Sequence, residues 1–216
     1  VHETRFSIII PVLGEQERIG LCLKNLRPLG FTDSRQVVVV DGDPAGGTID
    51  LVRDGDVLCL KSPAGRARQM NAGAAVAEGE ILLFLHADTT LPPGGLEKIS
   101  RIMATRHYVG SAFDLAIDSD SLFLRYIARR ASFRSRLNRI PYGDQAIFID
   151  RAYFDSLGGF RDIPIMEDVD LMCRIKRDRQ RIHILRDRVT TSARRWKAEG
   201  LLYTTLRNQF LMFFYY

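Results

Sequence analysis

Four short apolar runs, separated by helical patterns, restrict the possible folds of this chain more than any other feature. The runs are rich in valine, isoleucine and leucine and occupy residues 6–10, 36–40, 57–60 and 81–85. Helical patterns fill the intervals over residues 15–27, 48–54 and 66–77. Strands that alternate with helices pair in parallel, because each helix carries the chain back across a face of the sheet. The first half therefore predicts an α/β fold with a Rossmann-like, mostly parallel central sheet flanked by helices.

The second half of the chain changes character without a visible linker. Pro92 and Pro93 favour the start of a helix, which is predicted over residues 94–105. Further strands are predicted over residues 108–117, 146–149 and 181–185, and further helices over residues 120–138 and 167–177. The 216 residues contain no internal repeat, and this length suits one substantial core. We therefore expect a single domain over residues 1–216.

The composition and the cysteines are typical of a protein from a reducing compartment. Hydrophobic residues make up 46% of the chain and charged residues 26%, and no apolar stretch is long enough to cross a bilayer. Residues 1–5 lack the apolar segment of a signal peptide. Cys22, Cys59 and Cys173 are too scattered for a disulfide framework or a zinc cluster. We expect a cytoplasmic protein.

The net charge of +5 is unevenly distributed. Residues 1–118 carry 12 basic and 15 acidic side chains, whereas residues 119–216 carry 19 basic and 11 acidic ones. The basic second half favours anionic partners, which include phosphates, an acidic lipid surface and nucleic acid.

A polar loop follows the apolar run 36–40. It begins with Asp41, Gly42 and Asp43 and continues into Gly46-Gly47-Thr48. Ligands of open α/β sheets gather at the carboxyl ends of strands, and such a turn can offer backbone amides and a carboxylate to a nucleotide. Asp41 would then accept hydrogen bonds from the base or the ribose. The alternative is an ordinary turn in which Asp41 caps its own loop.

His86 and Asp88 follow the most apolar run, residues 81–85. Residues two apart in an extended chain lie on one face, so the imidazole and the carboxylate are expected to point into one crevice. A divalent cation that bridges phosphate oxygens suits this pair, although a hydrogen-bonded His–Asp pair without a metal is the alternative. Arg66 and Arg68 begin the alanine-rich helix, where an anion is attracted, and a solvated basic face is the alternative.

Several separated motifs, in this order, resemble those of the family 2 glycosyltransferases, which have the nucleotide-sugar-binding fold called GT-A. The resemblance covers most of the chain, and its motifs are Ser7-Ile8-Ile9-Ile10-Pro11 with Glu15, Asp41-Gly42-Asp43 with Gly47-Thr48, Asn71-Ala72-Gly73, His86-Ala87-Asp88, Gly158-Gly159-Phe160, and Glu167-Asp168-Val169-Asp170-Leu171 with Arg174. It implies a nucleotide-binding half, residues 1–118, and an acceptor-side half, residues 119–216. His86-Ala87-Asp88 occupies the place of the family's Asp-x-Asp metal motif.

The resemblance implies an inverting transfer of a sugar from a UDP- or GDP-sugar to an acceptor hydroxyl. Asp168 is the implied general base, and a carboxylate in this role accelerates the attack of a poorly nucleophilic hydroxyl. A divalent metal, Mn²⁺ or Mg²⁺, is implied at Asp88. The other residues implied in donor binding are Pro11, Glu15, Asp41, Asp43, Arg66, Arg68, His86 and Ala87. Those implied in the acceptor and diphosphate region are Asp144, Gln145, Glu167, Arg195 and Trp196.

Two departures from the family pattern limit these expectations. His86 stands where the first Asp of the metal motif is usual, so Asp88 is the stronger metal candidate and His86 the second. Ser192 stands where polymer-forming relatives have Gln in a Gln-x-x-Arg-Trp motif, so a processive polymerase is not expected. The spacing of the His86, Gly143-Asp144-Gln145 and Arg194-Arg195-Trp196 elements resembles a compact bacterial subgroup without a large extra domain.

Purely structural roles are the alternatives for the acidic cluster at Glu167 and for Trp196. Glu167 and its acidic neighbours also suit the N-terminus of a helix, where the macrodipole favours negative charge. Trp196 also suits a hydrophobic core.

Residues 120–139 form a basic, aromatic helical pattern. Six arginines alternate there with apolar side chains, so the helix suits the inner face of an anionic membrane and a lipid-linked acceptor. A core-facing apolar stripe with a solvated basic back is the favoured alternative. The apolar segment 210–216 would pack on the body, pair with another subunit or touch a bilayer.

Rival functions leave weaker signals in the sequence. A non-catalytic nucleotide-binding or basic interaction module at an anionic surface would explain the basic second half. No zinc-finger spacing or RNA-binding aromatic pattern occurs, so no nucleic acid is expected. A sugar-nucleotide pyrophosphorylase or a dinucleotide oxidoreductase on a related sheet is disfavoured because neither the Gly-x-Gly-x-x-Gly turn nor the P-loop lysine is present.

Overall fold

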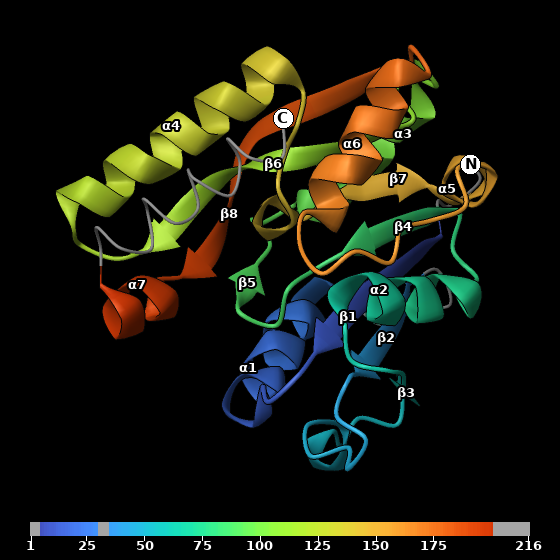
Figure 1. The fold of residues 1–216 in the computed structure, drawn as a ribbon, viewed down its shortest axis with the longest axis vertical. Helices are drawn as coiled ribbons and strands as arrows, with labels where there is room; N and C mark the ends of the chain where they lie inside the picture. Colours follow the sequence, from blue (N-terminus) through green and yellow to red (C-terminus); the bar gives the residue numbers. More distant parts are fainter. Residues whose placement is uncertain (1–4, 30–34, 201–216) are drawn as a thin grey trace.

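The parallel part of the sheet is built by the four apolar runs of the first half. A computed structural model describes residues 5–29 and 35–200. In it, β1 (Phe6–Val12), β2 (Arg35–Asp41), β3 (Val57–Lys61) and β4 (Ile81–Phe84) form parallel pairs in the order β3-β2-β1-β4 (Figure 1). Their carboxyl ends therefore lie at one edge of the sheet.

The second half of the chain extends the same sheet with mixed pairing. β7 (Phe148–Asp150) runs antiparallel to β4 and β6, and β6 (Gly110–Asp118) pairs in parallel with β8 (Ile182–Ser192). The two-residue β5 (Thr89–Thr90) pairs antiparallel with β8 at the edge. The complete order is β3-β2-β1-β4-β7-β6-β8-β5. Both halves of the chain thus share one sheet.

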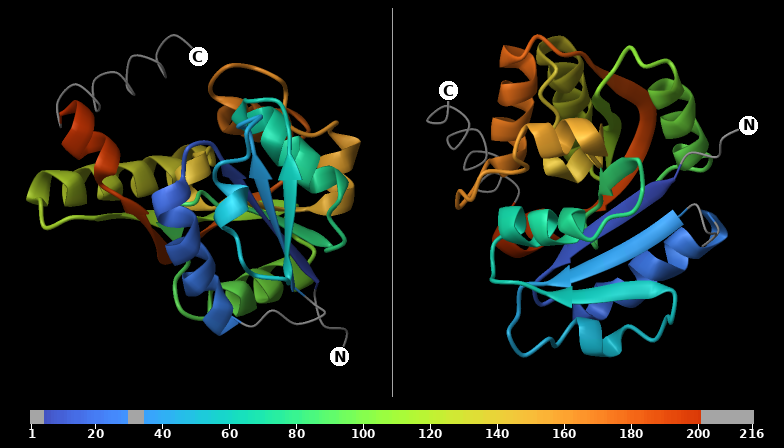
Figure 2. Two further views of the ribbon diagram at one scale, coloured as in Figure 1. Left: turned by 90° about the horizontal axis from the view of Figure 1, so that it is seen from below. Right: turned by 90° about the vertical axis from the view of Figure 1, so that its right-hand side faces the viewer.

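Helices cover both faces of the sheet. In the right-hand view of Figure 2, α1 (Gln16–Leu26) and α2 (Arg66–Ala75) lie on opposite sides of the parallel strands. One apolar cluster contains α1, α3 (Gly95–Ala104) and α4 (Leu122–Asn138). The other contains α2, α5 (Arg151–Ser156) and α6 (Glu167–Arg177). The structure is a three-layer α/β sandwich around two cores.

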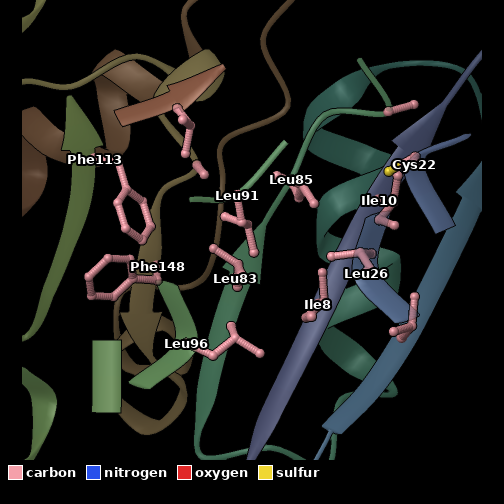
Figure 3. Close-up of a cluster of buried hydrophobic side chains, with 14 of the residues drawn as sticks. Ile8, Ile10, Cys22, Leu26, Leu83, Leu85, Leu91, Leu96, Phe113 and Phe148 are labelled. Carbon is pink, nitrogen blue, oxygen red and sulfur yellow. The ribbon is translucent and has the colours of Figure 1, made fainter. Parts of the chain in front are cut away.

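Strand β1 explains why these runs are apolar throughout. Ile8 and Ile10 point into the cluster under α1, whereas Ile9 between them points into the cluster under α2. A strand covered on both faces buries every side chain, which removes the polar alternation of a half-exposed strand. Figure 3 shows Ile10 beside Cys22 and Ile8 near Leu26, both residues of α1.

The structure confirms most of the expected elements and corrects several bounds. The predicted helix over 48–54 is only a 3-10 turn, η2 (Ile49–Leu51). β8 continues to residue 192, seven residues beyond the predicted strand. The prediction ended too early because the distal part of β8 has charged or polar side chains on an exposed face and so lacks an apolar pattern. The patterns also did not predict β5, α5 or α7 (Arg194–Glu199), which are all short. No helix in the described part of the chain is long and apolar enough to cross a bilayer.

Helix α4 buries Leu124 in the core, but most of its large apolar side chains are exposed, among them Leu122, Tyr126, Phe133 and Leu137. The expected core-facing apolar stripe is therefore present only as a narrow face. The residues that it buries are mostly small: Leu124, Ala128, Ser132 and Ser135. The Ser132 hydroxyl donates to the carbonyl of Ala128, and it accepts a hydrogen bond from a backbone amide of β6 at 2.9 Å. Small residues at this spacing allow a close approach of the helix to the sheet, which leaves the larger side chains on the outer face.

Candidate active site

The loop after β2 is organised by the carboxylate of Asp41, which is fully buried. One carboxylate oxygen accepts the Asp43 amide at 2.9 Å, and the other accepts the amides of Thr48 and Ile49 at 3.0 and 3.2 Å. This is the loop-capping arrangement that the sequence left open as the alternative. Asp43 is partly exposed and accepts the amide of Ala45 at 2.9 Å. Contacts of Asp41 or Asp43 with a nucleotide remain predictions.

Gln69 of α2 fastens the start of this helix to the ends of two strands. Its buried side-chain amide donates to the carbonyls of Val12 at 2.6 Å and Val40 at 2.9 Å. A Cβ atom at Gly42 would lie 3.0 Å from the Gln69 side chain, so the loop approaches α2 too closely for a larger residue. Sequence patterns did not single out Gln69, since a helical glutamine gives no signal of burial.

His86, Ala87 and Asp88 lie in a turn rather than in an extended strand. β4 ends at Phe84, and the Thr89 amide donates to the His86 carbonyl at 3.0 Å. The expectation that His86 and Asp88 share a face through strand alternation is therefore wrong, because alternation applies only to extended backbone. The backbone of Ala87 belongs to this turn, and its side chain is buried in the core.

His86 faces α6 across Gly143. A Cβ atom at Gly143 would lie 3.0 Å from His86 Nε2 and 3.4 Å from Asp168 Oδ2. Gly143 belongs to η3 (Gly143–Gln145), and its backbone amide donates to Asp168 Oδ2 at 2.5 Å. The imidazole and the carboxylate thus converge on one glycine from two different elements. The sequence named Gly143 as part of the Gly143-Asp144-Gln145 element but implied a site role only for Asp144 and Gln145.

Asp88 belongs to a chain of charges on the other side of the turn. Its carboxylate accepts the Thr191 hydroxyl at 3.5 Å and lies 3.8 Å from the guanidinium of Arg194. Arg194 also donates two hydrogen bonds, of 2.7 and 3.1 Å, to the carboxylate of Glu15. The hydrogen bonds to Glu15, more than the other neighbouring carboxylates, raise the pKa of Arg194 above its usual value. The sequence did not single out Arg194 and instead implied Arg195 in the acceptor and diphosphate region. The side chain of Arg195 lies outside the described residues.

The donor set around Asp88 suits one particular kind of metal site. Within residues 5–29 and 35–200, no three His, Cys, Asp or Glu side chains are grouped to hold a metal. Mg²⁺ and similar cations are commonly held by one or two carboxylates together with substrate phosphates. Asp88, whose side chain is 23% exposed, fits a cation shared with a bound diphosphate rather than an all-protein cage.

The three acidic side chains at the start of α6 have different partners. Glu167 is buried and pairs with Arg66 Nε at 2.8 Å. Asp170 pairs with Arg174 at 2.7 Å and Arg161 at 3.3 Å. Burial raises the pKa of Glu167, and the charge of Arg66 opposes this shift only in part. The carboxylates of Glu167 and Asp170 are therefore both engaged in ion pairs within the fold.

Asp168 differs from its two acidic neighbours because no cation neutralises it within the described residues. Its Oδ1 accepts the amide of Val169 at 2.8 Å and its Oδ2 accepts that of Gly143, and the residue is 7% exposed. These amides fix the direction of the carboxylate while leaving its charge uncompensated. A fixed carboxylate beside an imidazole can accept a proton from a hydroxyl that enters the site.

The Asn71-Ala72-Gly73 and Gly158-Gly159-Phe160 motifs join to each other. The Asn71 side chain donates to the Phe160 carbonyl at 2.8 Å and accepts the Phe160 amide at 2.9 Å. Gly158 and Gly159 have φ values of +74° and +72°, which L side chains rarely adopt. Arg174 donates to the carbonyl of Gly159 at 2.6 Å. The two motifs thus hold α2 and α6 on the same face of the sheet.

The remaining predicted site residues occupy varied positions. Arg68 is exposed and pairs with Asp162 at 2.8 Å, and Pro11 is partly buried at the end of β1. Gln145 is fully buried, with hydrogen bonds to Ser135, Tyr142 and Phe113, whereas Asp144 is partly buried. Trp196 packs against the core, the alternative left open, and its indole N–H has no partner among the described residues.

Comparisons with known proteins agree with this architecture. The family described as glycosyl transferase family 2 matches residues 7–160. The uncharacterized protein MT1568 of Mycobacterium tuberculosis (strain CDC 1551 / Oshkosh) is 29% identical and is matched over 78% of this chain and 61% of its own length.

Two solved structures are similar in fold. The mannosyltransferase PcManGT from Pyrobaculum calidifontis, in complex with GDP-Man and Mn²⁺, has a TM-score of 0.71 and 21% identity, covering 88% of this chain and 57% of its own. S. aureus TarS 1–349 in complex with UDP has a TM-score of 0.69 and 18% identity, covering 87% and 60%. The chain spans about three fifths of the length of these relatives.

The family match extends over more than half of the chain, from β1 to the loop between α5 and α6. It therefore includes the Asp41 loop, the His86-Ala87-Asp88 turn and Gly143. This protein belongs to glycosyl transferase family 2 and has the GT-A fold.

Proposed function

We propose that this protein transfers a sugar from a nucleotide-diphospho-sugar, a UDP- or GDP-sugar, to an acceptor hydroxyl with inversion. The observation that carries the proposal is that His86 and Asp168 both contact Gly143. His86 is two positions before Asp88 in the chain. A proton acceptor and a metal-binding carboxylate are thereby held near one turn. The complexes of PcManGT with GDP-Man and Mn²⁺ and of TarS with UDP-GlcNAc support a sugar nucleotide as the donor.

In this proposal, Asp168 accepts the proton of the attacking hydroxyl. Its carboxylate is pre-oriented by the amides of Gly143 and Val169, so little reorganisation accompanies the transfer. Asp88 would hold a divalent cation, Mn²⁺ or Mg²⁺, which when bound supplies positive charge to the departing diphosphate. Arg194, 3.8 Å from Asp88, adds a fixed cation beside the same place.

The Asp168→Asn variant tests the base. We expect it to retain nucleotide binding and to lose at least about 100-fold in donor turnover, since general-base catalysis contributes factors of this order. The measurement is the release of UDP or GDP from a panel of sugar nucleotides with Mn²⁺. Asp162→Asn, which alters an exposed carboxylate in the preceding loop, is the matched control. Undiminished turnover by Asp168→Asn would remove Asp168 from this role. A wild type that binds nucleotide without turnover would favour the non-catalytic binding module.

The outer face of α4 supports a peripheral membrane contact. Leu122, Phe133 and Leu137 are 78%, 63% and 76% exposed, and they alternate along the helix with exposed arginines that include Arg129 and Arg130. Apolar side chains flanked by arginines suit the headgroup region of an anionic bilayer. We propose that α4 lies against the inner face of a membrane, where a lipid-linked acceptor would be available.

Vesicle binding tests this contact. We expect wild type to float with phosphatidylglycerol vesicles and much less with phosphatidylcholine vesicles, with weaker binding at high salt. The double variant Phe133→Ser/Leu137→Ser should lose this binding. Leu21→Ser is the matched control, because Leu21 is 61% exposed on α1, away from α4. Equal flotation of the double variant and wild type would contradict a contact through α4.

A further inference from the structure

A cavity of about 720 Å³ lies between α4, α7 and the carboxyl ends of β6 and β8. Figure 1 shows α7 below the N-terminal end of α4, with the ends of β6 and β8 between the two helices. The side chains important here are Asp118, Asp120, Arg125, Arg129, Arg188 and Lys197. A volume of this size lies within the range of about 300–1,000 Å³ that small-molecule sites occupy.

The charges around the cavity are unbalanced. Four cationic side chains line it against the two carboxylates, and Arg125 lies 3.6 Å from Asp120. For Arg129, Arg188 and Lys197, no carboxylate of the described chain lies within the 4.0 Å of an ion pair. Arg188 also interacts with Asp114, opposite it on β6, yet cations remain in excess around the cavity. An excess of cations around a concave surface focuses a positive potential into it.

The chemistry of the lining favours phosphate over other anions. Three arginines offer paired N–H donors, which match the oxygens of a phosphoryl group in a two-pronged geometry. The hydroxyls of Ser119 and Thr190 on the same wall can complete the hydrogen bonding of a tetrahedral anion.

The cavity adjoins the candidate active site. A second cavity of about 430 Å³ shares Asp118 and Lys197 with it and is also lined by Ser192 and Arg194. Arg194 contacts both Glu15 and Asp88. In addition, the Ser192 amide donates to the Asp88 carbonyl at 3.1 Å. The two cavities are therefore neighbours, and Arg194 on the wall of the smaller one lies 3.8 Å from Asp88.

We propose that the cavity beneath α4 binds a phosphoryl group of the acceptor substrate through Arg129, Arg188 and Lys197. The acceptor would then be a phosphate-bearing molecule whose hydroxyl lies toward the candidate active site, on the side of the smaller cavity. The identification of the ligand as the acceptor substrate rests on the proposed function, whereas the phosphate site itself follows from the charges around the cavity. The phosphate could come from a lipid headgroup or from a soluble phosphate ester, since the recognising chemistry is the same.

The test uses protein saturated with UDP and Mn²⁺, or with GDP and Mn²⁺. Glycerol 3-phosphate is titrated calorimetrically as the soluble probe, and vesicles with and without phosphatidic acid serve as the lipid probe. We expect Arg129→Gln/Arg188→Gln to weaken binding of the responding probe by about tenfold or more, because two charge-assisted contacts are removed. Arg101→Gln, an exposed arginine of α3 outside both cavities, should leave binding unchanged.

The outcomes separate this inference from the proposed function. Binding of either probe that depends on Arg129 and Arg188 supports the site and identifies the source of the phosphate. If neither probe binds, or if the double variant binds as wild type does, the inference is overturned, even when UDP or GDP with Mn²⁺ still stabilises the protein. If the probes bind but no nucleotide does, the phosphate site stands and the proposed function fails. An unfolding temperature of the double variant equal to that of wild type excludes misfolding as the cause of weaker binding.

Discussion

The three carboxylates at the start of α6 have different roles because their surroundings differ. Glu167 is buried against Arg66, Asp170 is neutralised by Arg174, and Asp168 is held by two backbone amides. The sequence predicted the acidic cluster and its helix, and it implied a base at Asp168 through resemblance. Spacing alone did not reveal which carboxylate faces His86, since that depends on a contact with Gly143 from a distant segment.

The buried carboxylate of Glu167 makes stability depend on pH. Its pKa in the folded protein is raised above the ordinary value of 4.5, chiefly by burial. The folded state therefore retains this proton to higher pH than the unfolded state, and the stability gained in this way is lost as pH rises through the folded pKa. We expect wild type to lose stability relative to Glu167→Gln as pH rises above the ordinary value of 4.5 and through the raised pKa of the folded protein. Urea unfolding across this range measures the difference, with exposed Glu17→Gln as the control; a difference that stays constant with pH would contradict the assignment.

At the scale of elements, α2 is fitted tightly to the sheet, and a glycine sets its distance. A Cβ atom at Gly73 would lie 2.5 Å from Ile9 Cγ2 and 3.1 Å from Val40 Cγ2. Gly73→Ala should therefore destabilise the protein by about 1–3 kcal/mol through overpacking. Gly20 of the exposed face of α1 has no atom within 4 Å of the same position, so Gly20→Ala should stabilise the protein by about 0.5–1 kcal/mol. Chemical denaturation of both variants checks the pair, and equal effects of one sign would refute the close packing of α2.

The basic helix shows where reasoning from periodicity fails. An apolar stripe of α4 was expected to face the core, but only one large side chain, Leu124, is among the buried positions; the others are Ala128, Ser132 and Ser135. Hydrophobicity alone could not indicate this narrow buried face, because it depends on how close the curved strand β6 lies to the helix. Hydrogen bonds from Ser132 and Ser135 to α4 carbonyls satisfy the hydroxyls that this packing buries.

At the scale of the whole molecule, the order of elements could be predicted but their meeting points could not. The apolar runs located β1 to β4, and parallel pairing placed their loops at one edge of the sheet. The insertion of β7 between β4 and β6 has no local signal, and it brings the Gly143 segment to the Asp88 turn. The link from Glu15 to Arg194 likewise joins residues 179 positions apart, which no pattern in one sequence encodes.

Metal-dependent nucleotide binding tests the central claim most directly. The thermal unfolding of wild type and Asp88→Asn would be compared with UDP or GDP, in the presence of Mn²⁺ and after its removal by a chelator. We predict that one nucleotide raises the unfolding temperature of wild type only with Mn²⁺, and that Asp88→Asn loses most of this rise. Asp168→Asn should retain it. Stabilisation of Asp88→Asn equal to that of wild type, or the absence of any stabilisation by either nucleotide with Mn²⁺, would contradict the account.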